Sequence, residues 1–374
     1  MNRPDGFVGA VMAIEGVVDA TAMLHGQNGC RKGLLLSRRM CPRPERDVDL
    51  PVYDGVSVVP FSGINQGDYT GRSMGKLVRA LDLVSREDYR FIALLCSPGI
   101  SIVGDDCARA LGDCGPRIPS MVIDSSELGE EVWVGFDRAI RSTLEKITSE
   151  GKTVRPGTVV VTGLSIMHKD WRTFEEELCD ILGDMGLEVI CFAGAGCTVD
   201  QLIDSVNTEW CIDISPEYSV ATRSYYAERG VEVVSAEESP VGFDATESFY
   251  RRIAESTGRD CSPALERLRR FRRRAYDCIR ATGRDLRGRT FHVSAPESVR
   301  APLTRFLVKS FSMLESDMDY DYLFAEGDRC VTEKASGGCQ RCIDVGFPSR
   351  KVDFGMNPVL GLHGTMYLLD SLFL

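Results

Sequence analysis

The chain has 374 residues, of which 43% are apolar and 26% are charged, and its net charge is −11. This length allows two or three domains with cores of their own. The acidic balance argues against wholesale nucleic-acid binding, and no apolar stretch approaches the roughly 20 residues of a membrane span. Residues 1–5 lack the charged-then-apolar pattern of a signal peptide, so we expect a soluble cytoplasmic protein.

Residues 1–153 are predicted to form a first α/β unit. An apolar run over residues 7–23, rich in small residues, is typical of a closely packed helix. Two further helices are expected at 73–84 and 131–148. The predicted strands, which are short and either apolar or β-branched, cover residues 56–61, 91–96 and 121–123. A linker that contains Gly and Pro, residues 151–157, marks the predicted boundary.

In residues 154–285, predicted strands alternate plainly with predicted helices. The strands cover residues 158–162, 188–192, 210–214 and 231–234. The helices between them cover residues 171–185, 198–206 and 216–229. Alternation at this rhythm indicates parallel βαβ units. Helical connectors over 246–283, broken near Pro263, complete this second unit.

Residues 286–374 are predicted to form a third unit. It opens with a strand at 290–293 and a helix from Glu297. Strands are expected at 320–324 and 342–345, and the chain closes with a helix over 364–374.

Two distant segments each place one cysteine in a turn-rich sequence after an apolar run. Residues 25–30 read His-Gly-Gln-Asn-Gly-Cys, and residues 96–106 read Cys-Ser-Pro-Gly-Ile-Ser-Ile-Val-Gly-Asp-Asp. A cysteine just after a strand lies at the edge where open α/β sheets bind ligands. Glycine lets the backbone approach a bulky inorganic group closely. Cys30 and Cys96 are therefore candidates to share a metal cluster.

These two motifs resemble component 1 of nitrogenase and its relatives, which include the reductases of protochlorophyllide, chlorophyllide and nickel sirohydrochlorin diamide. Supporting similarity comes from residues 61–69 with Lys76-Leu77, from Gly-Phe-Pro at 346–348 and from Gly-Leu-His-Gly at 361–364. The resemblance covers nearly the whole chain. It implies three Rossmann-like units, each with a parallel sheet flanked by helices.

The resemblance also implies that Cys30 and Cys96 ligate a [4Fe–4S] cluster, with Gly26 and Gly29 beside it. Such a cube takes four ligands. Larger family members carry a third cysteine shortly before the first Gly-Ala of the chain, and here that region has none.

Three sources of further ligands are open. Two cysteines from each of two subunits, identical or paralogous, would supply four thiolates to one cluster on a twofold axis, and we prefer this arrangement. Asp5 lies near the position of the missing cysteine and could ligate as a carboxylate. Cys41 is a third candidate, although its Arg- and Pro-rich surroundings indicate a loop.

Other residue groups have both a functional and a plain interpretation. Cys330, Cys339 and Cys342 have a metal-like spacing and could hold an extra cluster, zinc or a redox pair, or be incidental thiols. His168 follows a predicted strand and could be a general acid or a capping residue. The arginine-rich run 267–274 could dock an acidic partner or bind substrate carboxylates, or be a solvated face paired with carboxylates.

Two features limit the chemistry. Residues 71–77 lack both the spacing and the Ser or Thr of a phosphate-binding loop, so we expect no ATP hydrolysis by this chain. Nitrogenase holds its active-site cluster with a cysteine and a histidine. The matching regions here, residues 213–216 and 350–353, contain neither residue type. Cys211 lies a few residues away and could be a shifted ligand, but the second region has no histidine, which argues against dinitrogen reduction.

The family resemblance implies an electron relay. A separate ATP-hydrolysing, nitrogenase reductase-like iron–sulfur protein would pass single electrons to the cluster. The cluster would then reduce a bound small-molecule substrate, for which a tetrapyrrole is the first class to consider. Two other functions stay open: a scaffold on which a complex metal cluster is assembled, and a Rossmann-type binding or regulatory protein without a cluster.

Overall fold

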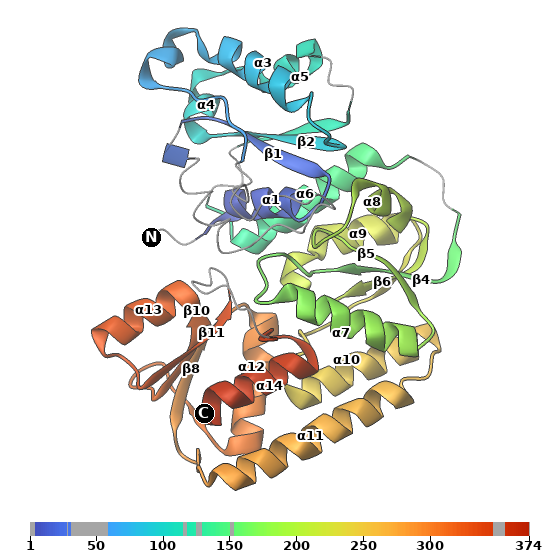
Figure 1. The fold of residues 1–374 in the computed structure, drawn as a ribbon, viewed down its shortest axis with the longest axis vertical. Coiled ribbons are helices and arrows are strands. Elements are labelled where there is room, and N and C mark those ends of the chain that lie inside the picture. The colour runs from blue at the N-terminus through green and yellow to red at the C-terminus, as the bar shows by residue number, and fades with distance from the viewer. Residues whose placement is uncertain are drawn as a thin grey trace. The chain divides into compact units, whose positions relative to one another are not determined.

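The computed structural model describes residues 4–27, 29–30, 59–114, 118–124, 129–149, 153–346 and 356–373. Cys41, residues 347–348 of the Gly-Phe-Pro signature and residues 350–353 lie outside these ranges. In the described residues, three parallel sheets are flanked by helices, as the sequence predicted (Figure 1). No helix in these ranges combines the length and apolarity needed to cross a membrane.

The first sheet contains three parallel strands in the order β1-β2-β3. These are β1 (Ala20–His25), β2 (Phe91–Cys96) and β3 (Ser120–Ile123). The helix predicted over 7–23 is wrong in its second half, because α1 (Gly6–Glu15) ends at Gly16 and β1 follows. Every residue of β1 is buried. A strand buried on both faces is a continuous apolar run, which periodicity cannot distinguish from a buried helix.

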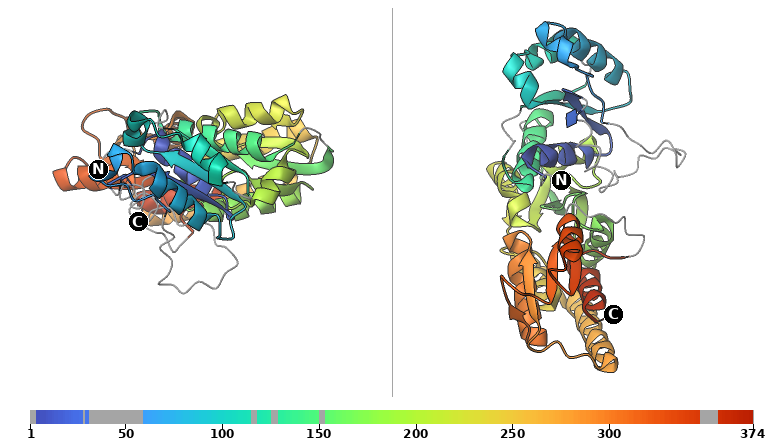
Figure 2. Two further views of the ribbon diagram at one scale, coloured as in Figure 1. Left: turned by 90° about the horizontal axis from the view of Figure 1, so that it is seen from above. Right: turned by 90° about the vertical axis from the view of Figure 1, so that its left-hand side faces the viewer.

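Helices cover both faces of this sheet. The helices α3 (Ser73–Val84) and α5 (Cys107–Cys114) lie on one face, and α1 and α6 (Val132–Ile147) lie on the other (Figures 1 and 2). The first face buries a cluster that includes Met23, Leu77 and Leu94. A short helix, α4 (Pro98–Val103), and a 3-10 turn, η1 (Gln66–Thr70), complete the first sheet's surroundings.

Helices α1 and α6 approach each other through glycines. A Cβ atom added at Gly135 would overlap the carbonyl oxygen of Gly6, and one at Gly9 would overlap that of Val132. We therefore expect Gly135→Ala to cost about 1–3 kcal/mol of unfolding free energy, as overpacking typically does. Gly112→Ala is the control, because open space surrounds its Cβ position on α5, and it should stabilise the helix by about 0.5–1 kcal/mol. Equal urea midpoints for the two variants would refute this close packing.

The second sheet has the strand order β5-β4-β6-β7. Its strands are β4 (Arg155–Thr162), β5 (Glu188–Phe192), β6 (Thr208–Asp213) and β7 (Glu232–Val234). The helices α7 (Trp171–Asp184), α8 (Val199–Ser205) and α9 (Val220–Glu228) alternate with these strands, as predicted. The predicted helical connectors are α10 (Gly242–Thr257) and α11 (Ser262–Thr282), and the predicted break lies between them.

The third sheet has the order β11-β10-β8-β9, so β11 is an edge strand. Its strands are β8 (Thr290–Ser294), β9 (Leu314–Glu315), β10 (Tyr322–Glu326) and β11 (Arg341–Gly346). Helices α12 (Glu297–Phe311) and α14 (Gly361–Phe373) were expected from the sequence. The helix α13 (Gly327–Ser336), which packs on β10 and β11, was not.

The chain divides into two compact units. Unit 1 comprises Met1–Thr153, Cys191–Asn207 and Val220–Arg229, and unit 2 comprises Val154–Ile190, Thr208–Ser219 and Gly230–Leu374. Each predicted unit, 1–153, 154–285 and 286–374, contains one sheet, and three separate domains remain a prediction.

Candidate metal centre

Both candidate cysteines follow neighbouring strands of unit 1. His25 ends β1, Cys96 ends β2, and the two residues are partners in the parallel register. Cys30 follows β1 after five residues and is exposed, whereas Cys96 is only 5% exposed. Because both strands end at one edge of the sheet, the two motifs start from one place in the fold.

The two motif glycines differ in their surroundings. A Cβ atom at Gly26 would lie 2.5 Å from Ser97 Oγ, so the close approach of the two motifs requires glycine there. At Gly29, apart from its chain neighbours, no atom of the described residues lies within 4 Å of the Cβ position. Gly26 thus has a packing role, for which the described residues give no counterpart at Gly29.

His25 connects three of the sequence motifs. Its buried ring lies 2.8 Å from Ser62 Oγ through Nδ1 and 3.0 Å from Asp105 Oδ2 through Nε2. Burial lowers the pKa of His25, although Asp105 opposes this shift. The neutral ring donates from Nε2–H to the carboxylate and accepts the Ser62 hydroxyl proton at Nδ1. The same Ser62 oxygen accepts the Gly26 N–H at 3.2 Å. His25 is therefore a bridging residue, not a free turn residue.

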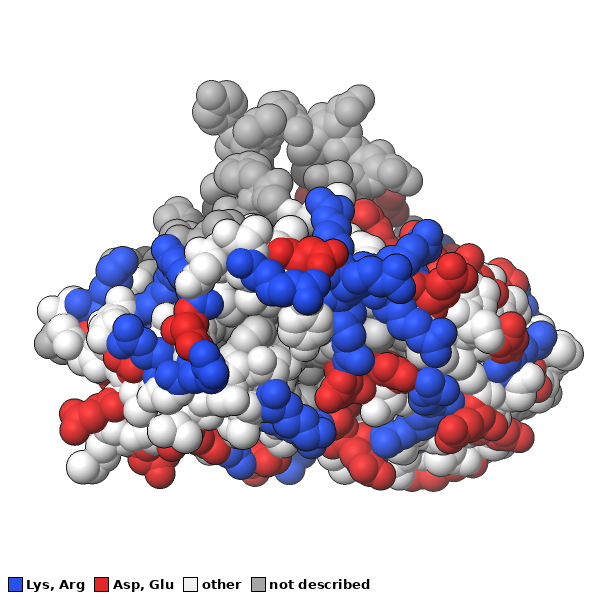
Figure 3. All heavy atoms as spheres, turned by 90° about the horizontal axis from the view of Figure 1, so that it is seen from below, with Lys and Arg blue, Asp and Glu red and all other residues white. Residues whose placement is uncertain are grey.

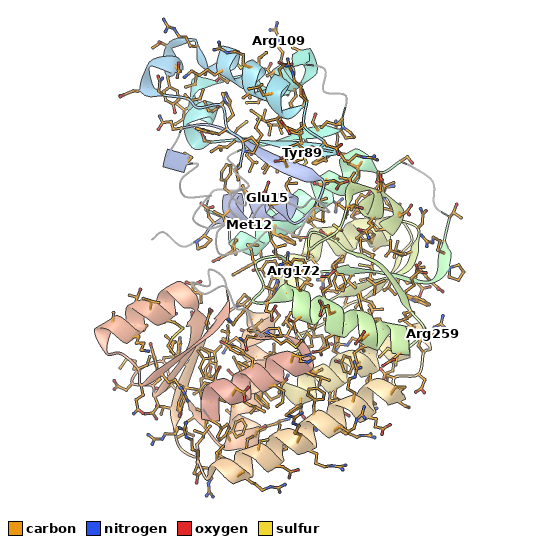
Figure 4. All side chains as sticks on the ribbon, in the orientation of Figure 1. Met12, Glu15, Tyr89, Arg109, Arg172 and Arg259 are labelled. Carbon is orange, nitrogen blue, oxygen red and sulfur yellow. A yellow bond between two sulfur atoms is a disulfide. The ribbon has the colours of Figure 1, made fainter. Side chains whose placement is uncertain are left out.

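Asp105 also reaches an open hollow between α3 and α5. The hollow has a volume of about 500 Å³, and Asp106, Arg109 and Asp113 contribute to its wall. Figure 4 labels Arg109 at the outer side of α5. The Asp105 side chain is 9% exposed. Asp105 thus contacts both the buried His25 and the hollow.

Cys107 is a neighbour of Cys96 that the sequence analysis missed. Both thiols are buried in the same apolar cluster on the α3–α5 face. A hydrogen bond with Cys107, together with burial, raises the pKa of the Cys96 thiol. The sequence contained a signal for this neighbour, because Cys107 directly follows the Gly-Asp-Asp motif. The buried, apolar surroundings of Cys107 are typical of a core cysteine.

Asp5 has a structural role in α1. Its carboxylate accepts the Val8 N–H at 3.2 Å and caps the helix, and its backbone bridges to Glu131. This cap accounts for an aspartate at this position without a metal. Its role as a cluster ligand remains a prediction.

His168 lies in unit 2, after β4. Its Nδ1 accepts the Ser165 N–H at 3.1 Å, and its Nε2 lies 3.4 Å from Ser215 Oγ. Burial lowers the pKa of His168 to about 4. The ring is therefore neutral near pH 7. Whether His168 is a general acid or a capping residue remains a prediction.

The lowered pKa of His168 predicts a loss of stability in acid. In the unfolded state this histidine gains a proton below its ordinary pKa of 6.5, whereas in the folded state it gains one only at about pH 4. The free energy of unfolding should therefore fall as the pH drops through this range. We expect His168→Gln to reduce this loss of stability, measured by urea unfolding at a series of pH values. An identical pH dependence in both proteins would contradict the shift.

Two of the three C-terminal cysteines are joined. Cys330 and Cys342 form a disulfide, and Cys339 is a free thiol. The spacing left an extra cluster, zinc, a redox pair or incidental thiols open, and α13 and β11 bring Cys330 to Cys342. In this state Cys342 offers no thiolate to a metal. In the described ranges, no three or more His, Cys, Asp or Glu side chains form a group that could hold a metal ion.

The predicted arginine-rich run lies on α11 in unit 2. Arg267 lies 3.7 Å from Asp180, and Arg272 pairs with Asp244 and lies 3.9 Å from Glu247. Four further members of the run are exposed: Arg269, Arg270, Arg273 and Arg274. Figure 3 shows the side that bears α11, where basic side chains gather beside acidic ones. The run is therefore a solvated helix face on which some of the arginines pair with carboxylates.

Three parallel sheets flanked by helices, with cysteine motifs at the carboxyl edge of the first sheet, define an α/β protein of the kind that binds cofactors at strand ends. Residues 6–313 match the family described as nitrogenase component 1 type oxidoreductase, and the chain belongs to this family.

Solved structures of a nitrogenase protein share the fold. The structure titled "Nitrogenase Cp1 at pH 6.5" superposes with a TM-score of 0.76 at 14% identity, over 100% of this chain and 93% of that one. "Nitrogenase Cp1 at pH 5" gives 0.77 at 13% identity, over 99% and 88%. No curated protein sequence matches the chain.

Proposed function

We propose that this protein is the catalytic component of a nitrogenase-like iron–sulfur oxidoreductase. The observation that carries the proposal is the register of β1 and β2, which brings the Cys30 and Cys96 motifs to one strand edge in a member of this family. The exposed Cys30 suits a cofactor at the surface of one chain. A cluster shared with a second chain is consistent with this exposure.

The proposed ligands make up half of a four-ligand set. One chain would supply Cys30 and Cys96, and among the described residues no group of three or more ligating side chains gathers. A [4Fe–4S] cluster takes four ligands, so two chains related by a twofold axis would complete it. The partner chain is an identical copy or a paralogue.

Each residue of the centre has a role in this proposal. When bound, the cluster would accept and pass on single electrons. Cys30 and Cys96 would hold it. The His25 bridge to Ser62 and Asp105 would fix the end of β1 relative to the second motif. The apolar cluster around Cys96 would exclude water from its thiolate.

The proposed electron donor is a separate ATP-hydrolysing iron–sulfur protein of the nitrogenase reductase type, because residues 71–77 do not form a phosphate-binding loop. The proposed substrate is a small molecule with an unreactive conjugated system, and a tetrapyrrole is the first class to test.

A scaffold function has less support, because it depended on surplus cysteines. Among the described residues, four free cysteines besides the proposed ligand Cys96 are buried: Cys107, Cys191, Cys197 and Cys211. Two more are joined in the disulfide. Substrate turnover by the isolated chain with its reductase would exclude a scaffold-only function.

Iron and acid-labile sulfide per chain, measured on oxygen-free protein together with its mass in solution, test the proposal. One shared cluster per dimer gives about two irons and two sulfides per chain. Much higher iron would indicate further clusters or a scaffold. A chain that binds no iron after reconstitution would refute the redox function and leave the fold unaffected.

A further inference from the structure

A disulfide joins two elements at the edge of the third sheet. Cys330 lies in α13, and Cys342 lies in β11, the edge strand. Their Cα atoms are 5.3 Å apart. Neither residue belongs to the centre at Cys30 and Cys96.

Cys342 is the more exposed half of this bond. Cys330 is 9% exposed, and Cys342 is partly exposed on an edge strand that no further strand covers in the described sheet. A thiolate that attacks a disulfide needs access to one sulfur, so Cys342 is the half of the bond where we expect attack. Reachable disulfides are the labile and regulatory ones, whereas structural ones resist reduction.

The described apolar packing beneath α13 forms one small cluster. Leu323, Ala325 and Cys330 are buried in it, and Tyr320, Cys339 and Cys342 pack against it partly buried. One of the three buried members is thus a half of the disulfide, so the covalent bond adds to the contacts that α13 makes with β10 and β11.

A third thiol lies against the same cluster. Cys339 packs on it from the turn between α13 and β11 and is partly exposed. Burial and the neighbouring Glu333 raise the pKa of Cys339, which disfavours the thiolate that would attack the existing bond.

We propose that Cys330 and Cys342 form a thiol–disulfide redox site that a dithiol partner reduces, releasing α13 from β11. A thiolate of the partner attacks the Cys342 sulfur, forms a mixed disulfide and expels the Cys330 thiolate, which takes a proton. The partner's second thiolate then displaces Cys342. The site gains two electrons and two protons, and the partner leaves as a disulfide.

The test uses the full chain, isolated without reductant, with dithiothreitol as the dithiol and glutathione disulfide as the oxidant. Alkylation after acid quenching and peptide mapping should show a Cys330–Cys342 link that native dithiothreitol opens and glutathione disulfide restores. Amide exchange in α13 should become about tenfold faster on reduction, while that in α12 stays unchanged.

Matched variants separate the possible outcomes. The double variant Cys330→Ser/Cys342→Ser should show fast α13 exchange with and without dithiothreitol, and Cys278→Ser, an exposed cysteine on α11, should behave like the unmodified chain. A link that opens only when the chain unfolds would make the bond a structural cross-link. Two free thiols in the isolated chain, or zinc or iron that Cys339→Ser removes, would also overturn the proposal. None of these outcomes depends on a cluster at Cys30 and Cys96.

Discussion

Cys30→Ala and Cys96→Ala are each expected to remove most of the iron and the visible absorption of the protein purified without oxygen. In a cluster shared across a twofold axis, one substitution deletes two of the four thiolates, because both chains carry it. Loss of an outer-shell group already weakens metal binding by about 10–100-fold, so the loss of two ligands should exceed that. Iron, sulfide and the absorption spectrum measure this directly.

The controls for this prediction come from the same chain. Cys211→Ala removes a fully buried cysteine of the second sheet and should leave iron content unchanged. Asp5→Asn keeps an oxygen that can cap α1 but removes the carboxylate, so it tests ligation without costing the cap. Full iron in both the Cys30 and Cys96 variants would show that the ligand assignment is wrong. Iron loss in the Asp5 variant would instead favour the carboxylate.

Local patterns predicted the second sheet well, because each strand there is a short apolar run between helices with clear periodicity. The first sheet was harder. The run over 7–23 contains both α1 and most of β1, and both are almost entirely buried. Without a polar face, neither a period of 3.6 nor one of 2 appears, and only the helix end at Gly16 separates the two elements.

The candidate centre was predictable in its cysteines but not in its contacts. His25 and Asp105 belong to different motifs, 80 positions apart in the chain. Their contact depends on β1 and β2 lying side by side, which no local pattern specifies. The disulfide was unpredictable for the same reason. The spacing of the three C-terminal cysteines does not specify which of them meet, whereas the packing of α13 on β11 brings Cys330 to Cys342.

A buried carboxylate in unit 2, which the sequence analysis did not single out, holds the start of the last helix. Glu177 on α7 accepts the Leu362 N–H at 2.7 Å and the His363 N–H at 3.0 Å. It also accepts from His363 Nδ1 at 2.7 Å and from Tyr250 Oη at 3.2 Å. Gly361 lies so close that a Cβ atom there would be 2.5 Å from Glu177 Oε1.

We expect Glu177→Ala to destabilise unit 2 by about 3–5 kcal/mol, the usual cost of removing one partner from a buried charged network. The substitution leaves the buried hydroxyl of Tyr250 and two N–H groups at the start of α14 without their acceptor. Urea unfolding followed by circular dichroism measures the change. Glu176→Ala is the matched control, because the neighbouring side chain on α7 is exposed and its loss should cost little.

The pH dependence separates the ion pair from the rest of this network. The Glu177 carboxylate raises the pKa of His363, so the pair's contribution is fully present below 6.5 and is lost as the pH rises through the raised value. His363→Ala should therefore cost more stability at pH 6 than at pH 9, whereas Glu177→Ala should remain costly at both, because Leu362 and Tyr250 do not titrate with His363. If Glu177→Ala and His363→Ala lost the same stability at every pH, the carboxylate would act through the histidine alone, and its role as the acceptor for α14 would be wrong.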